Sequence, residues 1–128
     1  MKLLRYGSPG QEKPGLLDQD GTIRDLSGIV PDIAGEVLSP AGLDRLRGVD
    51  PSTLPRVEGE QRIGPCVGQV GKFICIGLNY SDHAAESGMA VPPEPVIFMK
   101  ATSAICGPND GIEIPRGAEK RAKKKKVD

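Results

Sequence analysis

The sequence predicts a mainly β fold with short helices, which places it in the α+β class, and three observations support this. An Asp-Gly turn joins two apolar runs near the N-terminus. Two later runs, "KFICI" and "VIFMK", have the length and apolar content of strands that are buried on both faces. Helical patterns occur only as short segments. With 128 residues and an aromatic content of 3%, we expect a modest, largely aliphatic core.

The N-terminal part is predicted to form a small β unit. The runs "KLLRYG" and "PGLLDQDGTIRDL" have the composition of short strands, and the second folds into a hairpin across residues 18–21. A short helix follows, in which Ser39 is the expected N-cap, Pro40 takes the first helical position and Gly48 ends the run. We expect this helix to pack on the hairpin sheet.

The second half of the chain follows a stretch that is rich in Gly and Pro and shows little periodicity, as linkers do. Beyond this stretch the predicted elements are strands at 73–78 and 96–100, a helix that begins within 79–86, a further strand at 102–106, a turn at 107–111 and an edge strand that ends at Pro115.

Charge is unevenly distributed although the formal net charge is zero. Residues 120–128 hold six basic residues and one acid, which leaves eleven basic and sixteen acidic residues upstream, or about −5 against about +5. The basic tail could bind a polyanion through its ammonium groups. The acidic body and the lack of interleaved aromatic residues favour simple solvated chain instead, so nucleic acid is not the expected partner.

No apolar run is long enough to cross a bilayer and no signal-peptide core is present, so we expect a cytoplasmic protein with no membrane association. Cys66, Cys75 and Cys106 are odd in number and follow no paired spacing. They are predicted to be reduced thiols rather than a disulfide framework or a zinc site.

The stretch "GLNYSDHAAESG" contains the only histidine of the chain, His83, with Glu86 three residues later. If Ser81 or Asp82 caps a helix here, the two side chains share one helix face. The carboxylate could then hold one imidazole nitrogen while the other takes a proton from water near neutral pH. Loops at the carboxyl ends of buried strands often carry such sites.

A plain structural explanation competes with the catalytic one. Asp82 and Glu86 would merely favour the positive N-terminus of a surface helix, where each charge is worth about 0.3 to 1 kcal/mol. His-x-x-Glu is by itself a weak motif. Lys100 is equally open, since it is an enolate-stabilising cation if it points inward and a solvated lysine if it does not.

The run "KFICIGLNYSDHAAESG...PPEPVIFMKATSAICGPNDGIEIPRG" resembles the start of the catalytic domain of the fumarylacetoacetate hydrolase superfamily. The preceding "MKLLRYGSPGQEKPGLLDQDGTIRDLSGIV" resembles the small N-terminal domain of bacterial members, especially those named ureidoglycolate lyase. The resemblance implies the opening part of a mixed β-sandwich or roll. The implied regions are a small β-rich domain at 1–60, a linker at 61–72, an incomplete catalytic domain at 73–119 and the basic tail at 120–128.

This resemblance favours the catalytic interpretation of His83. Members of the superfamily are hydrolases, decarboxylases, isomerases and lyases that act on 2-oxo acids and related carboxylates with Mg²⁺ or Mn²⁺, and the resemblance implies a homodimer for a full-length enzyme. It implies that His83 and Glu86 match the water-activating pair and that Lys100 matches the lysine of an "F-x-K" strand. It also implies that Asn79 and Tyr80 belong to the substrate-binding segment that lines the pocket.

The sequence departs from the family pattern after the proline-ended strand. There the family carries a Glu-x-Glu type of segment, which with a later aspartate holds the divalent ion, whereas "IPRGAEK" here runs into "RAKKKKVD". Protonated lysines offer no lone pair and repel a cation. We therefore assign no metal ligand and expect no bound ion, a chain that is cut short and inactive alone, and strands left uncovered unless another chain covers them.

The expected function is thus that of the N-terminal portion of such an enzyme. Ureidoglycolate lyase, which releases glyoxylate and urea, is the first candidate. Acylpyruvate hydrolase, oxaloacetate decarboxylase and hydroxyheptadienedioate isomerase are alternatives from the same family. An alternative of another class is a non-catalytic remnant that binds a partner or a polyanion through exposed strands or the Lys-rich tail.

Overall fold

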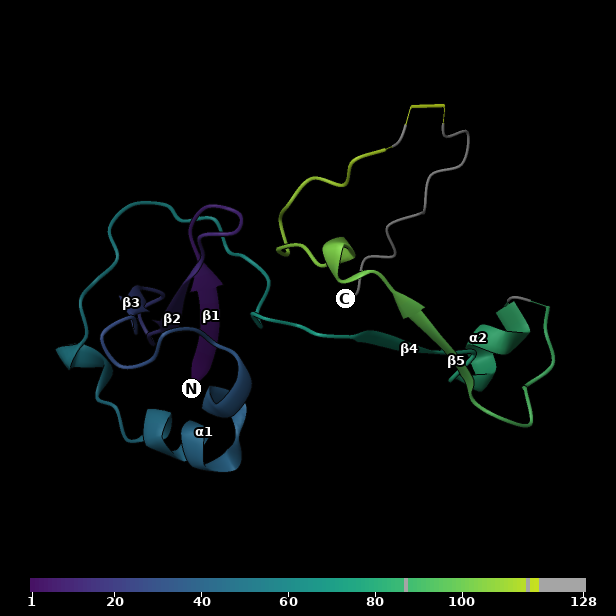
Figure 1. Cartoon of the computed structure of the whole chain (residues 1–128), viewed down its shortest axis with the longest axis horizontal. Coiled ribbons are helices and arrows are strands. Elements are labelled where there is room, and N and C mark those ends of the chain that lie inside the picture. Colours follow the sequence, from purple (N-terminus) through teal and green to yellow (C-terminus); the bar gives the residue numbers. More distant parts are fainter. Residues whose placement is uncertain (87, 115, 118–128) are drawn as a thin grey trace.

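A computed structural model describes residues 1–86, 88–114, 116 and 117 of the chain. Its strands form two small antiparallel sheets, accompanied by a few short helices, so the predicted α+β class is confirmed. The first sheet contains β1 (Lys2–Tyr6), β2 (Lys13–Leu17) and β3 (Ile23–Asp25) in the order β1-β2-β3. Figure 1 shows the second sheet lying apart from the first, with an extended segment between them.

The predicted hairpin across residues 18–21 joins β2 to β3. The Asp18 amide donates to the Thr22 carbonyl at 2.9 Å, and the Gly21 amide donates to the Asp18 carbonyl at 3.2 Å. Gly21 has φ of +81°, a conformation that residues with a Cβ adopt only at a cost. The turn sets a register in which Leu17 pairs with Ile23.

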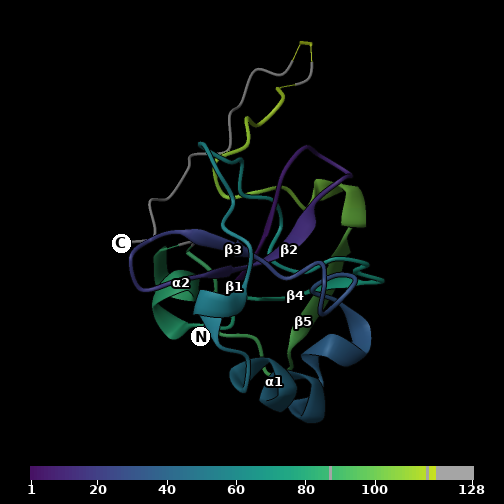
Figure 2. The same ribbon diagram turned by 90° about the vertical axis from the view of Figure 1, so that its left-hand side faces the viewer.

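The predicted N-terminal helix is also confirmed, as α1 (Pro40–Arg47). The Ser39 hydroxyl accepts a hydrogen bond from the Gly42 amide at 3.1 Å, and Pro40 occupies the first turn, where a missing N–H costs nothing. Short 3₁₀ segments, η1 (Gly35–Leu38) and η2 (Pro51–Thr53), flank the helix. Both views place α1 below the three-stranded sheet (Figures 1 and 2).

The apolar core lies between this sheet, α1 and the segment that follows β3. Leu26 is fully buried, and Leu46 of α1 is 1% exposed. Removing a leucine side chain from water contributes about 1.5–3 kcal/mol, so a few such residues dominate the stability of a unit this small. The buried cluster consists of Leu16, Leu26, Val30, Ile33, Leu46 and Leu54.

The stretch predicted as a linker begins as an addition to the first sheet. Ile63 forms an isolated antiparallel bridge with Tyr6 of β1. The Gly64 amide donates to the Arg5 carbonyl at 2.8 Å, and the Gly7 amide donates to the Arg62 carbonyl at 3.0 Å. We call residues 1–70, which share this sheet and core, the N-terminal module.

The second sheet is a two-stranded hairpin of β4 (Phe73–Gly77) and β5 (Val96–Lys100). Helix α2 (Ser81–Glu86) lies in the connection between them. The apolar content of the two strands is that of strands buried on both faces, yet every residue of β5 is exposed and β4 alternates between exposed and half-buried residues. This exposure agrees with the expectation that the strands are left uncovered in this chain. No second layer covers them in the described residues.

Two expectations for the segment after β5 are wrong. The strand expected at 102–106 is a short 3₁₀ helix, η3 (Thr102–Ala104), in which the Ala104 amide donates to the Ala101 carbonyl at 3.0 Å. Residues 111–114 form no edge strand. In neither place do the described residues offer a neighbouring strand to pair with, and at 102–105 local 3₁₀ hydrogen bonds satisfy the backbone instead. The expected turn near 107–111 is present, and the basic tail at 120–128 lies outside the described residues.

Candidate active site

The candidate site begins where β4 ends. Leu78 follows Gly77 with φ of +50°, a left-handed conformation that is costly for a branched side chain and that reverses the chain after the strand. Asn79 and Tyr80 come next, and α2 starts at Ser81. The strand end and the reversal therefore bring the start of α2 to the end of the hairpin that Gly77 and Val96 form.

His83 and Glu86 both belong to α2, as the sequence predicts. Residues three apart on a helix lie on neighbouring positions of one face, so the backbone permits the proposed pairing of imidazole and carboxylate. Asp82 lies in the first turn, and both Asp82 and Glu86 are exposed. A contact between His83 and Glu86 stays a prediction.

A hollow of about 430 Å³ opens beside the end of β4. Asn79 lines it, together with residues 76–78 and the Pro-rich segment 91–95. Tyr80 is 70% exposed and is not among the lining residues. The structure thus gives Asn79 a position from which it can contact a bound molecule, while the substrate-binding roles of both residues stay predictions.

Lys100 lies at the other end of the hairpin. The register pairs Phe73 with Lys100 and Gly77 with Val96, so Lys100 stands across from the first residue of β4 while α2 follows its last. Four steps along an antiparallel strand amount to about 13 Å. The described hairpin therefore does not bring the Lys100 backbone close to α2.

No group of three or more His, Cys, Asp and Glu side chains in the described part of the chain could hold a metal ion. The described residues thus do not fit the oxygen ligand set that Mg²⁺ or Mn²⁺ requires, and the expectations about the metal stay predictions. Cys66 and Cys106 are exposed, Cys75 is half-buried, and all three are free thiols. No helix among the described residues is both long and apolar enough for a membrane span.

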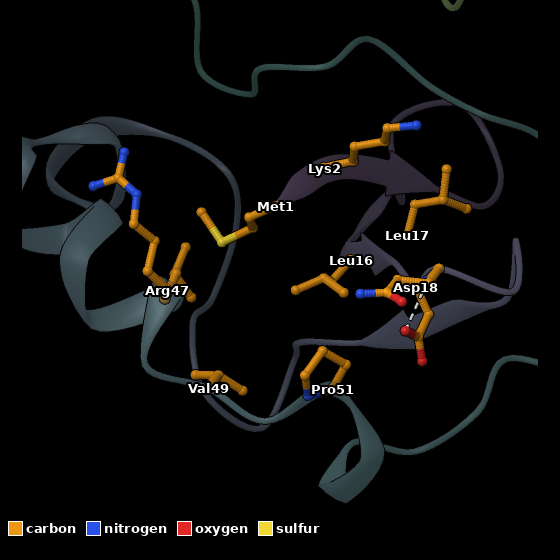
Figure 3. Close-up of a pocket in the computed structure, with 10 residues that line it drawn as sticks. Met1, Lys2, Leu16, Leu17, Asp18, Arg47, Val49 and Pro51 are labelled. Carbon is orange, nitrogen blue, oxygen red and sulfur yellow. Dashed lines mark hydrogen bonds between the residues drawn. The ribbon is translucent and has the colours of Figure 1, made fainter.

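A second hollow, of about 490 Å³, lies in the N-terminal module and contains none of the predicted site residues. Figure 3 shows Leu16, Val49 and Pro51 forming an apolar floor, with Lys2, Asp18 and Arg47 around its rim. Asp18 accepts from the backbone amide of Gln19 at 2.7 Å and from Arg24 at 3.0 Å. Its carboxylate is thus engaged in local structure.

Sequence reasoning missed one cluster of charged side chains. Arg62, in the predicted linker, donates to both carboxylate oxygens of Asp110, at 2.7 and 2.6 Å, and to Glu12 at 3.0 Å. Arg62 is 50 positions from Glu12 and 48 from Asp110, so no local pattern could reveal the contact. The only sequence signal is the Gly-Pro-Asn-Asp turn that presents Asp110.

Comparison with known protein families identifies a match in the second half of the chain. Residues 72–127 match the sequence model of the family described as fumarylacetoacetate (FAA) hydrolase C-terminal. This span contains β4, α2 and β5, and therefore all the predicted site residues.

The comparisons support the predicted relationship of this chain to the fumarylacetoacetate hydrolase superfamily.

Relatives from Burkholderia species extend the similarity into the N-terminal module. Proteins from Burkholderia multivorans and Burkholderia cenocepacia are each 74% identical over 120 residues, and one from Burkholderia lata is 72% identical. Their names assign them provisionally as hydrolases. In each case the match covers 94% of this chain and 43% of the relative, so the chain spans less than half the length of the relatives it matches.

Proposed function

We propose that the chain carries the proton-transfer part of a fumarylacetoacetate hydrolase-type active site, with His83 as general base and Glu86 as the group that orients it. The observation that supports this most is the position of both residues three apart on α2, directly after the end of β4, within the segment that matches the family. Asn79 lines the adjoining hollow and is proposed to contact the substrate, with Tyr80 beside it in sequence.

In the proposed reaction a neutral imidazole of His83 removes a proton from water, and the Glu86 carboxylate holds the other ring nitrogen and stabilises the imidazolium that forms. The ammonium group of Lys100 is proposed to stabilise negative charge that develops on an enolate-like product. Because Lys100 lies at the opposite end of the hairpin from α2, its role requires a separate test.

The proposed substrates are 2-oxo acids and related carboxylates, with ureidoglycolate as the first to test and acylpyruvates and oxaloacetate next. We also propose Mg²⁺ or Mn²⁺ as the cofactor of the whole enzyme and a homodimer as its assembly. When bound, the ion would neutralise developing charge on substrate oxygens. Its ligands are proposed to lie outside the described residues, and we expect no turnover from the 128 residues alone.

A chimera tests the proposal. The matching 120 residues of the Burkholderia multivorans protein are replaced by those of this chain, and turnover is measured with Mn²⁺ on the three substrate classes. His83→Ala and Glu86→Gln should each lower kcat by about 10²- to 10⁴-fold, the usual contribution of general base catalysis. Glu58→Gln serves as the matched control, since Glu58 is an exposed carboxylate in the N-terminal module.

Full activity of the His83→Ala chimera would contradict the proposal. Lys100→Met is compared with Lys72→Met, a second exposed lysine next to the same hairpin. A loss confined to Lys100→Met supports the role of Lys100, and equal activity of the two variants removes Lys100 from the mechanism while leaving His83 in place.

A second candidate of another class rests on the exposed apolar residues of the hairpin. Ile74, Ile76, Ile97 and Met99 are 46–67% exposed, which is unusual for strand residues of this kind. Such a surface suits partner binding without catalysis. The chimera decides between the two candidates, because a partner-binding surface requires neither His83 nor turnover.

A further inference from the structure

Arg62 connects three segments that are far apart in the sequence. Its guanidinium donates to both oxygens of Asp110, to the Glu12 carboxylate at 3.0 Å and to the Gly7 carbonyl at 3.0 Å. Glu12 and Gly7 belong to the turn between β1 and β2, whereas Asp110 lies beyond β5. A planar guanidinium that binds a carboxylate through two parallel bonds fixes orientation as well as distance.

The surroundings of this contact shield it from water. The side chains of Glu12, Asp110 and Arg62 are 6%, 22% and 26% exposed. Arg5 of β1 approaches the other oxygen of Glu12 at 3.7 Å and itself binds Asp32 at 2.7 Å. Partly buried, networked ion pairs of this kind resist screening better than isolated surface pairs.

The turn that carries Asp110 is built against the linker. The Asp110 carboxylate accepts from the Gly107 amide at 2.7 Å, which closes the turn. A Cβ on Gly107 would lie 2.2 Å from the Ile63 carbonyl oxygen, so only glycine allows this approach. Residues 107–110 therefore press directly on residues 62–64, which are in turn paired with β1.

The Arg62–Asp110 ion pair and the packing of Gly107 against Ile63 close a loop in the chain. Residues 71–106, which include β4, α2 and β5, leave the N-terminal module after residue 70, and the chain returns to the module at Gly107, beside Ile63. We propose that Arg62, anchored in the module by Glu12, is a positioning residue that fastens the returning end of this segment to the N-terminal module through Asp110, and so fixes the candidate active-site segment relative to the module.

The charges of the cluster give this latch a pH dependence. Burial favours the neutral form of Glu12, but the hydrogen bond from Arg62 and the positive charges of Arg5 and Arg62 outweigh it, so the pKa of Glu12 lies below its ordinary value of 4.5. The hydrogen bond from Arg62, together with that from the Gly107 amide, lowers the pKa of Asp110 below 3.8. Both carboxylates stabilise the latch when ionised.

The sign of the effect follows from these directions. Because both pKa values are lower in the folded state, the stabilisation is complete above about pH 4.5 and is lost as the pH falls through the folded-state values. Other charged groups beside the cluster are Asp32, which Arg5 binds, and Glu60, which lines the same hollow as Arg62 and Asp110. The latch is therefore closed at neutral pH and opens in acid.

Hydrogen exchange of individual amides in the full chain tests the latch. Arg62→Gln should speed exchange of the Gly107 and Asp110 amides by about tenfold or more, while the Val30 amide in the core of the module keeps its protection. Arg62→Lys keeps the charge and should restore part of the protection. Arg56→Gln is the matched control, because Arg56 is 59% exposed and lies 3.8 Å from Glu58.

A pH series separates a positioning role from general support of the fold. After correction for intrinsic exchange, the Gly107 amide of the unmodified chain should lose protection below about pH 4.5, and Arg62→Gln should show no such step. Asp110→Asn, which preserves the shape of the side chain, should reproduce the local loss. Unchanged protection at Gly107 in both variants, or equal loss at Val30, would overturn the proposal.

As a positioning role for catalysis, the inference also rests on the proposed function. In the chimera, Arg62→Gln should lower kcat and Arg62→Lys should recover part of it, and full activity of Arg62→Gln overturns that part of the inference. A chimera that is inactive on every substrate refutes the proposed function alone, because the exchange experiment measures the latch without any turnover.

Discussion

The N-terminal module and the β4–β5 hairpin show what strand pairing alone does and does not provide. Both contain antiparallel strands rich in leucine, isoleucine and valine. In the module, α1 and the segment after β3 cover the sheet, and Leu26 is 0% exposed. In the hairpin, Ile97 is 67% exposed. Apolar composition therefore predicts a strand, whereas burial requires a second layer.

The largest effect expected from this comparison is at Leu26. Leu26→Ala removes fully buried methyl groups and leaves a cavity, so the free energy of unfolding of the module should fall by about 2–5 kcal/mol. Urea unfolding followed by circular dichroism measures the change. A loss below about 1 kcal/mol, the size of an average substitution, would show that the module lacks a well-packed core.

A smaller effect is expected at Tyr6, which is 6% exposed. Burial, the negative charge of Asp25 and a hydrogen bond to it raise the pKa of Tyr6 from 10.0 to about 12. Tyr6→Phe should cost about 1.5 kcal/mol at neutral pH, the low end for a hydrogen bond to a charged group. Because the folded-state pKa is raised, this advantage is complete below pH 10 and is lost as the pH rises through about 12.

Urea unfolding at neutral pH and at steps between pH 10 and 12 follows the Tyr6 effect. Tyr80→Phe is the control from the other region, where the phenol is 70% exposed, and should change the free energy of unfolding by less than about 0.5 kcal/mol. A difference between Tyr6→Phe and the unmodified chain that stays constant up to pH 12 would refute the assignment.

The smallest effect on stability is expected in the hairpin. Ile97→Ala should change the unfolding of the module by less than about 0.5 kcal/mol, because the side chain is largely in water already. Ile76→Ser combined with Ile97→Ser should instead lower the binding of a fluorescent apolar dye. Ile29→Ser, at a 38% exposed position of the module, is the control and should leave dye binding unchanged. An equal loss of dye binding in the hairpin double variant and in Ile29→Ser would contradict the difference between the two regions.

Local signals in the sequence predicted the N-terminal module well. The Asp-Gly turn and the Ser39-Pro40 helix start act within a few residues, so one sequence suffices to find them. The start of α2 near His83 was found for the same reason. The failures at residues 102–106 and 111–114 have a common cause, since a strand exists only where a second strand pairs with it.

The candidate site was predicted only in part. Spacing on a helix can place His83 and Glu86 on one face, but it cannot place Lys100, whose position depends on the register between β4 and β5. The contact of Arg62 with Asp110 spans 48 residues and lies in a segment without periodicity. Long-range ion pairs of this kind carry no short-range signature, and only the fold reveals them.

The apolar composition of both hairpin strands affects how strongly the sequence specifies the register between β4 and β5. A sheet with one apolar and one solvent-exposed face disfavours a shift of strand register by one residue, because every side chain of the shifted strand would then move to the opposite face. In β5, Ile97 and Met99 lie on one face of the hairpin and Val96 and Phe98 on the other, so both faces are apolar. The two strands by themselves therefore disfavour a one-residue shift of register only weakly. A layer of protein that covers one face of the hairpin would also determine on which face Lys100 lies.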